Sequence, residues 1–209
     1  MSGASDPALW DAEAPGFDSA PDHGLLDPEV RAAWRDLLLG VLPSSPADVV
    51  DLGCGTGTLA VLLAEHGFAV DAIDFSPAMV RLASAKVAAA SAPVRRLVTV
   101  RTGDAADPGL APASVDVVLC RHVLWALPDP ALAVRRWVGA LRPGGRLVLV
   151  EGDWSTGAGL TAERCAEIVG ESCASVEVCH LPDPRLWGHE ISDERYLVVA
   201  RLSGTLRAR

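Results

Sequence analysis

The stretch that decides the fold lies near residue 50 and reads Val49-Val50-Asp51-Leu52-Gly53-Cys54-Gly55-Thr56-Gly57-Thr58-Leu59-Ala60. An apolar run ends in an acid, three alternating glycines follow, and Leu59, Leu62 and Leu63 then recur at helical spacing. This order predicts a strand, a tight turn and a helix. Glycine suits a turn that takes positive φ or that a ligand approaches closely, and the helix start offers unpaired backbone N–H groups. The stretch therefore predicts a loop that binds a nucleotide-like ligand.

The spacing of the glycines narrows the choice of ligand. A dinucleotide fingerprint, G-x-G-x-x-G/A, counted from Gly53 would need a small residue where Thr58 stands, and the third glycine comes one residue early, at Gly57. A phosphate-binding loop would need a following Gly-Lys-Ser/Thr, which is missing. The pattern instead resembles motif I of the class I S-adenosylmethionine (SAM) dependent methyltransferases, an acid followed by x-G-x-G-x-G. The alternative is an ordinary glycine-rich turn.

The resemblance implies that the acid and the loop contact SAM. The residues concerned are Asp51, Gly53, Cys54, Gly55, Thr56 and Gly57.

Composition limits the class of protein. The length of 209 residues suits one domain with a full core, and half of the residues are hydrophobic. A net charge of −9 without a basic stretch argues against a nucleic-acid partner and favours a small-molecule substrate. No apolar run approaches the roughly 20 residues that span a bilayer, and the N-terminus lacks the segments of a secretory signal. We therefore expect a cytoplasmic protein without a membrane partner; its oligomeric state stays open.

The cysteines also favour a cytoplasmic location. The five cysteines are odd in number and form no C-x-x-C pair, which indicates reduced thiols rather than disulfides. Cys165, Cys173 and Cys179 lie near His180 in the sequence, but their spacing matches no zinc pattern. We expect no metal site.

The remaining pattern predicts an α/β fold. Apolar runs typical of strands alternate with helical patterns, which is the sign of a parallel sheet with helices on both faces. The expected strands are 48–53, 69–74, 96–101, 115–120, 146–151, 176–180 and 195–202, and the expected helices lie near 57–66, 77–91, 130–141 and 161–173. This order resembles the Rossmann-like class I methyltransferase fold over residues 8–202. The resemblance implies a seven-stranded, mostly parallel sheet whose last strand runs antiparallel, between the fifth and the sixth.

The first 45 residues differ from the rest. They are acidic and rich in proline, and they carry Trp10, Phe17 and Trp34 around one expected helix near 28–41. We expect residues 1–45 to form a helical lid, residues 46–203 to form the SAM-binding methyltransferase domain, and residues 204–209 to be a tail, all within a single domain. In this interpretation Phe17 contacts the cofactor, and His23 closes over the site as a candidate catalytic residue.

Two further motifs follow strands. The strand at 69–74 ends in Asp74, about 20 residues after the glycines as in related nucleotide folds. The resemblance implies that this carboxylate accepts hydrogen bonds from both ribose hydroxyls of SAM, with Phe75 and Met79 beside it; a helix-capping acid is the alternative. Residues Gly103, Asp104 and Ala105 follow the third strand, where the resembled family reads adenine.

The fourth motif, residues 114–130, resembles motif IV of small-molecule methyltransferases. There the strand end faces the methionine half of SAM and the substrate, which implies a cofactor contact for Arg121. His122 is the first candidate for a general base, and a loop histidine bonded to the backbone is the alternative. Trp125 is expected to pack against the cofactor or the substrate.

The predicted function is methyl transfer from SAM to a small acceptor. The resemblance is closest to methyltransferases of quinone and secondary-metabolite biosynthesis, which implies a phenol or enol oxygen as the acceptor. Two alternatives remain: a SAM-binding relative that catalyses a rearrangement or regulates a partner, and an NAD-dependent oxidoreductase, against which Thr58 argues.

Overall fold

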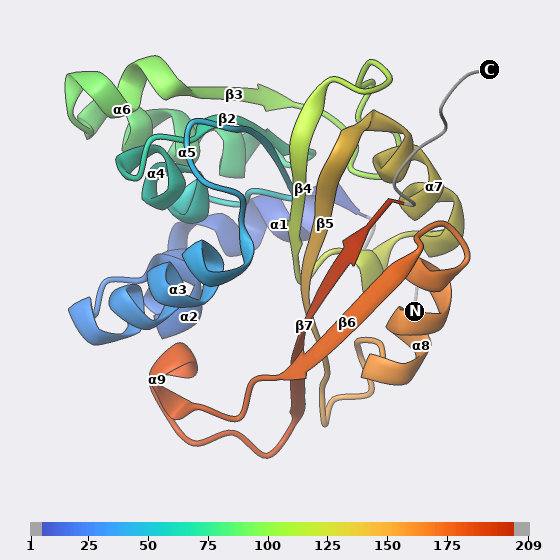
Figure 1. The fold of residues 1–209 in the computed structure, drawn as a ribbon. Helices are drawn as coiled ribbons and strands as arrows, with labels where there is room; N and C mark the ends of the chain where they lie inside the picture. Colours follow the sequence, from blue (N-terminus) through green and yellow to red (C-terminus); the bar gives the residue numbers. More distant parts are fainter. Residues whose placement is uncertain (1–5, 203–209) are drawn as a thin grey trace.

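A computed structural model describes residues 6–202 and contains one seven-stranded sheet (Figure 1). The expected tail at 204–209 lies outside the described residues. The strand order is β3-β2-β1-β4-β5-β7-β6. The strands are β1 Asp48–Leu52, β2 Ala69–Asp74, β3 Val98–Thr102, β4 Val115–Arg121, β5 Leu141–Asp153, β6 Ser175–His180 and β7 Glu194–Arg201.

The direction of the strands confirms the predicted fold class. Strands β3, β2, β1, β4 and β5 pair in parallel, and β7 pairs antiparallel with both β5 and β6. The last strand therefore lies between the fifth and the sixth. Its antiparallel direction brings the first residues of β7 to the edge of the sheet where β1, β2, β4 and β5 end.

The helices cover both faces of the sheet (Figure 1). They are α1 Pro7–Glu13, η1 Ala14–Ser19, α2 Pro21–Gly24, α3 Pro28–Val41, α4 Thr58–Glu65, α5 Pro77–Ala89, α6 Ala92–Leu97, η2 Leu124–Ala126, α7 Pro130–Ala140, α8 Ala162–Gly170 and α9 Pro184–Trp187. Val49 and Val50 are neighbours in β1, so they point to opposite faces. Val49 joins the core cluster that contains Trp34 of α3, whereas Val50 joins the cluster that contains Trp137 of α7. A strand buried on both faces reads as a continuous apolar run, as β1 does.

Three predicted boundaries were wrong by a few residues. The strand expected at 96–101 begins only at Val98, because Pro93 opens the short helix α6 and Val94 is buried against the core. The helix expected at 161–173 ends at Gly170. Strand β5 begins at Leu141, five residues before the expected start, and its early part contains Gly144 with φ 82°.

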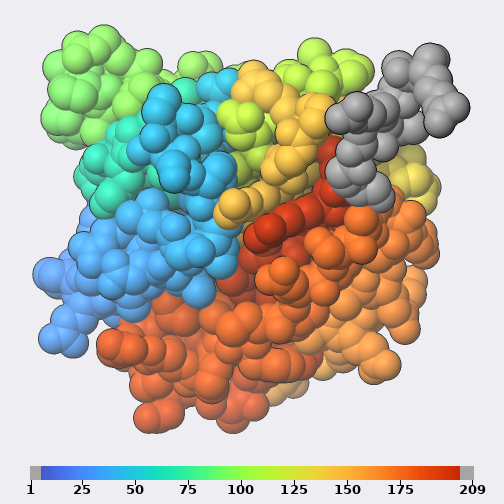
Figure 2. All heavy atoms as spheres, in the orientation of Figure 1, coloured from blue at the N-terminus to red at the C-terminus, as the bar shows by residue number. Residues whose placement is uncertain are grey.

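The N-terminal segment is more ordered than expected. Besides α3 it contains α1, η1 and α2, and the space-filling view shows the N-terminal helices lying against the segment that carries α9 (Figure 2). Trp34 is fully buried, donates its indole N–H to Leu186 O at 2.7 Å, and packs edge to face on Trp187 at 5.6 Å. Helix α3 is thus part of the core. Within the described residues no helix combines the length and apolarity that crossing a bilayer requires.

Candidate active site

A cavity of about 550 Å³ lies at the edge of the sheet where the parallel strands end. Open α/β sheets bind their ligands at this edge, and the volume falls in the usual range for ligand pockets, roughly 300–1,000 Å³. Most of the predicted site residues line the cavity together. They are Phe17, His23, Gly53, Cys54, Gly55, Asp74, Phe75, Met79, Asp104, Ala105, Arg121, His122 and Trp125.

Four other predicted cofactor residues are not among those that line the cavity: Asp51, Thr56, Gly57 and Gly103. Gly57 has φ 77° and starts α4, and a Cβ atom there would lie 2.9 Å from Ala83 Cβ of α5. Its role is therefore to let two helices approach each other. A Cβ atom at Gly103 would lie 2.8 Å from the Ile73 side chain, which is again a packing constraint.

The glycine loop forms a cradle with little side-chain bulk. Gly53 and Gly55 take φ 68° and 55°, a region that side chains rarely adopt. Gly53 N–H donates to Ile73 O, and Gly55 N–H donates to Asp74 Oδ2 at 2.8 Å. A Cβ atom at Gly55 would come within 3.0 Å of the Phe17 ring. Only glycine leaves this space open, and the loop therefore fits a flat, nucleotide-like cofactor.

Asp74 is held in place by backbone groups. Besides the bond from Gly55, its Oδ1 accepts from Ser76 N–H at 2.9 Å. Burial raises the pKa of Asp74, and the backbone N–H groups oppose that shift by favouring the ionised form. A carboxylate has about four acceptor positions. The remaining ones can receive the two hydroxyls of a ribose.

Asp104 and Ala105 close the cavity beside the end of β3. Asp104 Oδ1 accepts from Ala106 N–H at 2.8 Å, which fixes this turn, and Ala105 O accepts the indole N–H of Trp137 at 2.7 Å. The turn is therefore anchored both locally and to α7.

Asp51 of β1 and Arg121 of β4 carry opposite charges on neighbouring strands. Asp51 is 2% exposed, and burial raises its pKa to about 7 while Arg121 opposes the shift. Arg121 packs its guanidinium 5.0 Å from the centre of the Trp34 ring and donates from Nη1 to Asp22 O. A permanent positive charge thus lies where the motif IV comparison placed the methionine half of SAM.

The two candidate catalytic histidines meet over the cavity. Their ring centres lie 6.3 Å apart, and His23 also stacks on Phe17 at 4.2 Å. Burial lowers the pKa of both imidazoles, that of His122 well below its usual value. Within the described residues neither ring nitrogen of His122 makes a hydrogen bond, and Nε2 is buried. Both rings are therefore neutral near pH 7 and can accept a proton.

The structure brings together one set of side chains with metal-ligand character. In the described part of the chain, only Asp22, His23 and His122 have three donor atoms within 4.8 Å of one another. Arg121 lies directly beside this group, and its charge disfavours a cation there. The cysteines near His180 form no such group within residues 6–202.

Comparison with known proteins identifies the family. Residues 50–149 match a family model described as a methyltransferase domain. The chain is 33% identical over 141 residues to the ubiquinone biosynthesis O-methyltransferase of Xanthomonas campestris pv. campestris, an alignment that covers 67% of this chain and 54% of that protein. The chain thus spans about half the length of the curated relatives it matches. It belongs to the class I SAM-dependent methyltransferases. SAM is therefore its cofactor.

Solved structures share the fold. A possible histamine N-methyltransferase from Thermotoga maritima superposes with a TM-score of 0.70 at 17% identity, covering 94% of this chain and 99% of that chain. The (4+2)-cyclase SpnF also reaches 0.70, at 18% identity, covering 83% and 81%. At such identities the likeness concerns the fold alone.

Two acids connect the N-terminal segment to the glycine loop and to the start of α5. Asp11 Oδ1 accepts from Ser76 Oγ at 2.5 Å and from Ala78 N–H at 2.9 Å, at the start of α5. Asp18 pairs with Lys86 Nζ at 2.8 Å and accepts from the Thr56 hydroxyl. Each contact joins the segment before α3 to an element of the cofactor site.

Sequence reasoning missed one wall of the cavity. The residues that it did not assign to the site include Trp154, Thr156 and Ala158 from the loop after β5, and Arg195 from the start of β7. A tryptophan in a short loop after a strand is the one signal that pointed to it; nothing in the sequence shows that Arg195 reaches the same edge.

Proposed function

We propose that the chain transfers the methyl group of SAM to an oxygen of a small acceptor, a phenol or enol. The observation that carries this proposal is the His122 imidazole, which lines the cavity, is neutral, and has no hydrogen-bond partner among the described residues. A neutral imidazole beside a buried cavity suits the removal of a proton from a hydroxyl group.

The cofactor residues divide the site into two ends. In this proposal the glycine loop and Asp74 hold the ribose, Asp104 and Ala105 hold the adenine, and Arg121 faces the methionine carboxylate. When bound, SAM supplies an electrophilic methyl group on a positively charged sulfur. The acceptor then occupies the end lined by His122, Trp125 and Trp154.

The chain's own residues have three tasks in the reaction. His122 takes the proton of the acceptor hydroxyl as the new O–C bond forms and the S–C bond breaks, which leaves S-adenosylhomocysteine. The aromatic wall orients the acceptor for in-line attack. Phe17 and His23 cover the reacting groups and exclude water.

The proposal includes the lid. Residues 1–45 would form a covering unit on the domain 46–203, with the part before α3 closing the site. Asp11 and Asp18 support this role, because their partners are residues of α5 and the glycine loop. A cytoplasmic location is part of the proposal, in keeping with five free cysteines.

The test separates binding from turnover. His122 has φ 59°, a conformation that asparagine tolerates better than most residues, so His122→Asn is the variant of choice. We expect kcat to fall by about 100-fold or more, while calorimetry shows S-adenosylhomocysteine binding within about 3-fold. His189→Asn, at an exposed histidine, is the matched control. Unchanged kcat in His122→Asn would remove the base from the mechanism.

A second candidate function is SAM binding without methyl transfer. It is favoured by one finding, that a cyclase shares the fold. Mass spectrometry decides between the two: methyl transfer gives S-adenosylhomocysteine and methylated acceptor in equal amounts, and the alternative gives neither.

A further inference from the structure

The acceptor end of the cavity is a wall of aromatic rings. Trp154 lies 5.1 Å from the His122 ring and 5.7 Å from the Trp125 ring, measured between ring centres. On its far side His122 stacks against Trp187 at 6.1 Å. A flat aromatic molecule fits such a wall better than a flexible aliphatic one, because stacked rings gain contact area at little entropic cost.

One permanent charge lies in this wall. The guanidinium of Arg195 packs 5.0 Å from the centre of the Trp154 ring and 5.5 Å from that of Trp187, and its side chain is only 11% exposed. Its hydrogen bonds are long: 3.2 Å from Nη2 to Asp193 Oδ2 and 3.3 Å from Nη1 to Glu194 O. Charge-assisted bonds are usually about 2.7–2.9 Å. A guanidinium has five N–H donors, so Arg195 keeps donors for a ligand.

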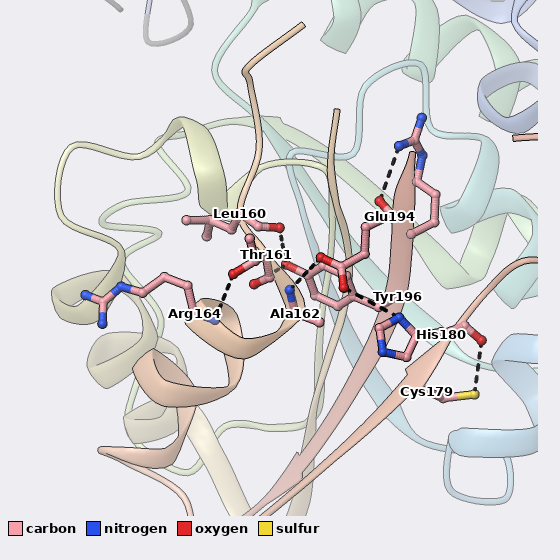
Figure 3. Close-up of polar contacts among 9 residues, drawn as sticks. Leu160, Thr161, Ala162, Arg164, Cys179, His180, Glu194 and Tyr196 are labelled. Atoms are coloured by element: carbon pink, nitrogen blue, oxygen red, sulfur yellow. Dashed lines mark hydrogen bonds and ion pairs between the residues drawn. The ribbon is translucent and has the colours of Figure 1, made fainter. Parts of the chain in front are cut away.

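The neighbours of Arg195 in β7, Glu194 and Tyr196, make contacts that Figure 3 draws. Glu194 Oε2 accepts from Ala162 N–H at 3.0 Å, and the Tyr196 hydroxyl donates to Leu160 O at 2.8 Å. Both contacts tie β7 to the end of the loop that carries Trp154. Asp193 Oδ1 ties the beginning of that loop by accepting from Ser155 N–H at 2.8 Å. The strand that carries Arg195 and the loop that carries Trp154 are therefore joined at both ends of the loop.

A glycine leaves room for this arginine. Gly152 pairs with Arg195 across β5 and β7, and a Cβ atom on Gly152 would lie 2.8 Å from the backbone oxygen of Glu194 and 2.9 Å from Arg195 Cδ. Any larger residue would crowd both the strand backbone and the arginine side chain. The chain thus keeps a largely buried cation in the cavity lining.

We infer that the acceptor is a small aromatic carboxylic acid whose carboxylate binds to Arg195 while its hydroxyl faces His122. This inference rests on the proposed function. Arg195 and His122 both lie about 5 Å from the same Trp154 ring, so a single substituted ring can span them. The cavity of about 550 Å³ must also hold SAM, which leaves room only for a compact acceptor.

The charges nearby favour a carboxylate over a phosphate. A guanidinium matches the two oxygens of a carboxylate in a bidentate arrangement. A phosphate dianion would need more donors than one guanidinium offers, and its second negative charge would add to the repulsion from the Asp193 carboxylate, which lies 3.2 Å from Arg195 Nη2. The other arginine of the cavity, Arg121, already donates to Asp22 O and faces the cofactor end.

The experiment uses matched probes with the full chain. Calorimetry on protein saturated with S-adenosylhomocysteine compares 4-hydroxybenzoate, 3,4-dihydroxybenzoate and 4-hydroxycinnamate, each with its methyl ester. We expect at least one acid to bind 10-fold or more tightly than its ester. In Arg195→Gln that acid should lose about 10- to 100-fold in affinity and the ester less than about 3-fold. Arg195→Lys should fall between, since lysine keeps the charge but not the bidentate geometry.

The controls keep the outcomes distinct. Arg164→Gln removes an exposed arginine of α8 and should leave the affinity for acids unchanged. If every acid binds no better than its ester, or if Arg195→Gln weakens both equally, the inference is overturned while the proposed function stands. If S-adenosylhomocysteine itself does not bind the parent protein, the proposed function fails, and this inference fails with it.

Discussion

The ring of Phe17 lies on the backbone of Gly55, so close that a Cβ atom built on Gly55 would come within 3.0 Å of Phe17 Cε1. The two residues are far apart in the sequence. Their contact places the first segment of the chain directly on the loop that motif I assigns to the cofactor. The same short distance makes the loop sensitive to any added side chain.

The first prediction concerns this loop. Gly55→Val should weaken S-adenosylhomocysteine binding by about 100-fold or more, because a β-branched side chain would enter the cradle and displace Phe17. Gly109→Val is the matched control: Gly109 also has positive φ, 64°, but a Cβ atom there meets nothing within 4 Å. Both variants should lose stability, and only Gly55→Val should lose the ligand in calorimetry. Retained binding in Gly55→Val would refute the motif assignment.

The second prediction concerns the ribose contact. Asp74→Ala should weaken SAM binding by roughly 10- to 150-fold, since hydrogen bonds to a charged group contribute about 1.5–3 kcal/mol. Asp71→Ala changes an acid on the same strand that pairs with Arg101 away from the cavity, and it should bind SAM normally. Unchanged affinity in a folded Asp74→Ala protein would exclude Asp74 from the site.

The third prediction concerns the lid. Deletion of residues 1–24 removes only two buried described residues, Ala14 and Gly24, and leaves the core from Leu25 onward complete. The truncated chain should therefore fold, bind SAM more weakly and lose turnover, because water reaches the reacting groups. Circular dichroism, calorimetry and a product assay measure the three effects. Full turnover by a stable truncated protein would contradict the lid.

The fourth prediction isolates one lid contact. Asp18→Asn removes the ion pair with Lys86, whose side chains are 35% and 27% exposed, so the free energy of unfolding should change by no more than about 1 kcal/mol. The dissociation rate of S-adenosylhomocysteine, measured by stopped flow, should nevertheless rise several-fold. Lys86→Ala also loses the bonds from Nζ to the Thr56 and Thr58 hydroxyls, so it should raise this rate at least as much. An unchanged dissociation rate would show that the pair does not hold the lid closed.

The fifth prediction concerns pH. Glu151 is fully buried, its Oε1 accepts from Val123 and Leu124 N–H, and burial raises its pKa from 4.5 to about 8. The folded state therefore binds a proton that the unfolded state releases between about pH 4.5 and 8, so stability should fall as pH rises through this window. The slope contributed by this group is at most about 1.4 kcal/mol per pH unit.

Glu151→Gln tests this because a neutral amide cannot ionise. Urea unfolding at pH 5.5 and 8.5 should show that the free energy of unfolding falls more between the two pH values in the parent than in the variant. The contribution of Asp51 is the same in both proteins, so it cancels from this difference. Equal losses in the two proteins would mean that Glu151 is ionised in the folded state throughout.

The cofactor end of the site could be predicted because its residues follow directly after strands. Gly53, Asp74, Asp104 and Arg121 each stand just past an apolar run, and parallel strands bring all such positions to one edge. Residues that each follow a strand in the sequence therefore lie close together in the fold. The unpaired imidazole of His122 could not be predicted, because hydrogen bonding of a loop side chain depends on which rings pack around it.

The sequence by itself determined the fold class, the family and the cofactor, because local patterns of apolar residues, glycines and acids encode strands, turns and the loop between them. Only the tertiary structure decided which residues enclose the acceptor. Arg195 lies 41 positions after Trp154, and the two meet because β7 runs antiparallel beside β5. Likewise, Trp34 belongs to the core and Phe17 to the cavity, although both are aromatic residues of the same segment. Such distinctions depend on contacts between distant parts of the chain, which no local pattern specifies.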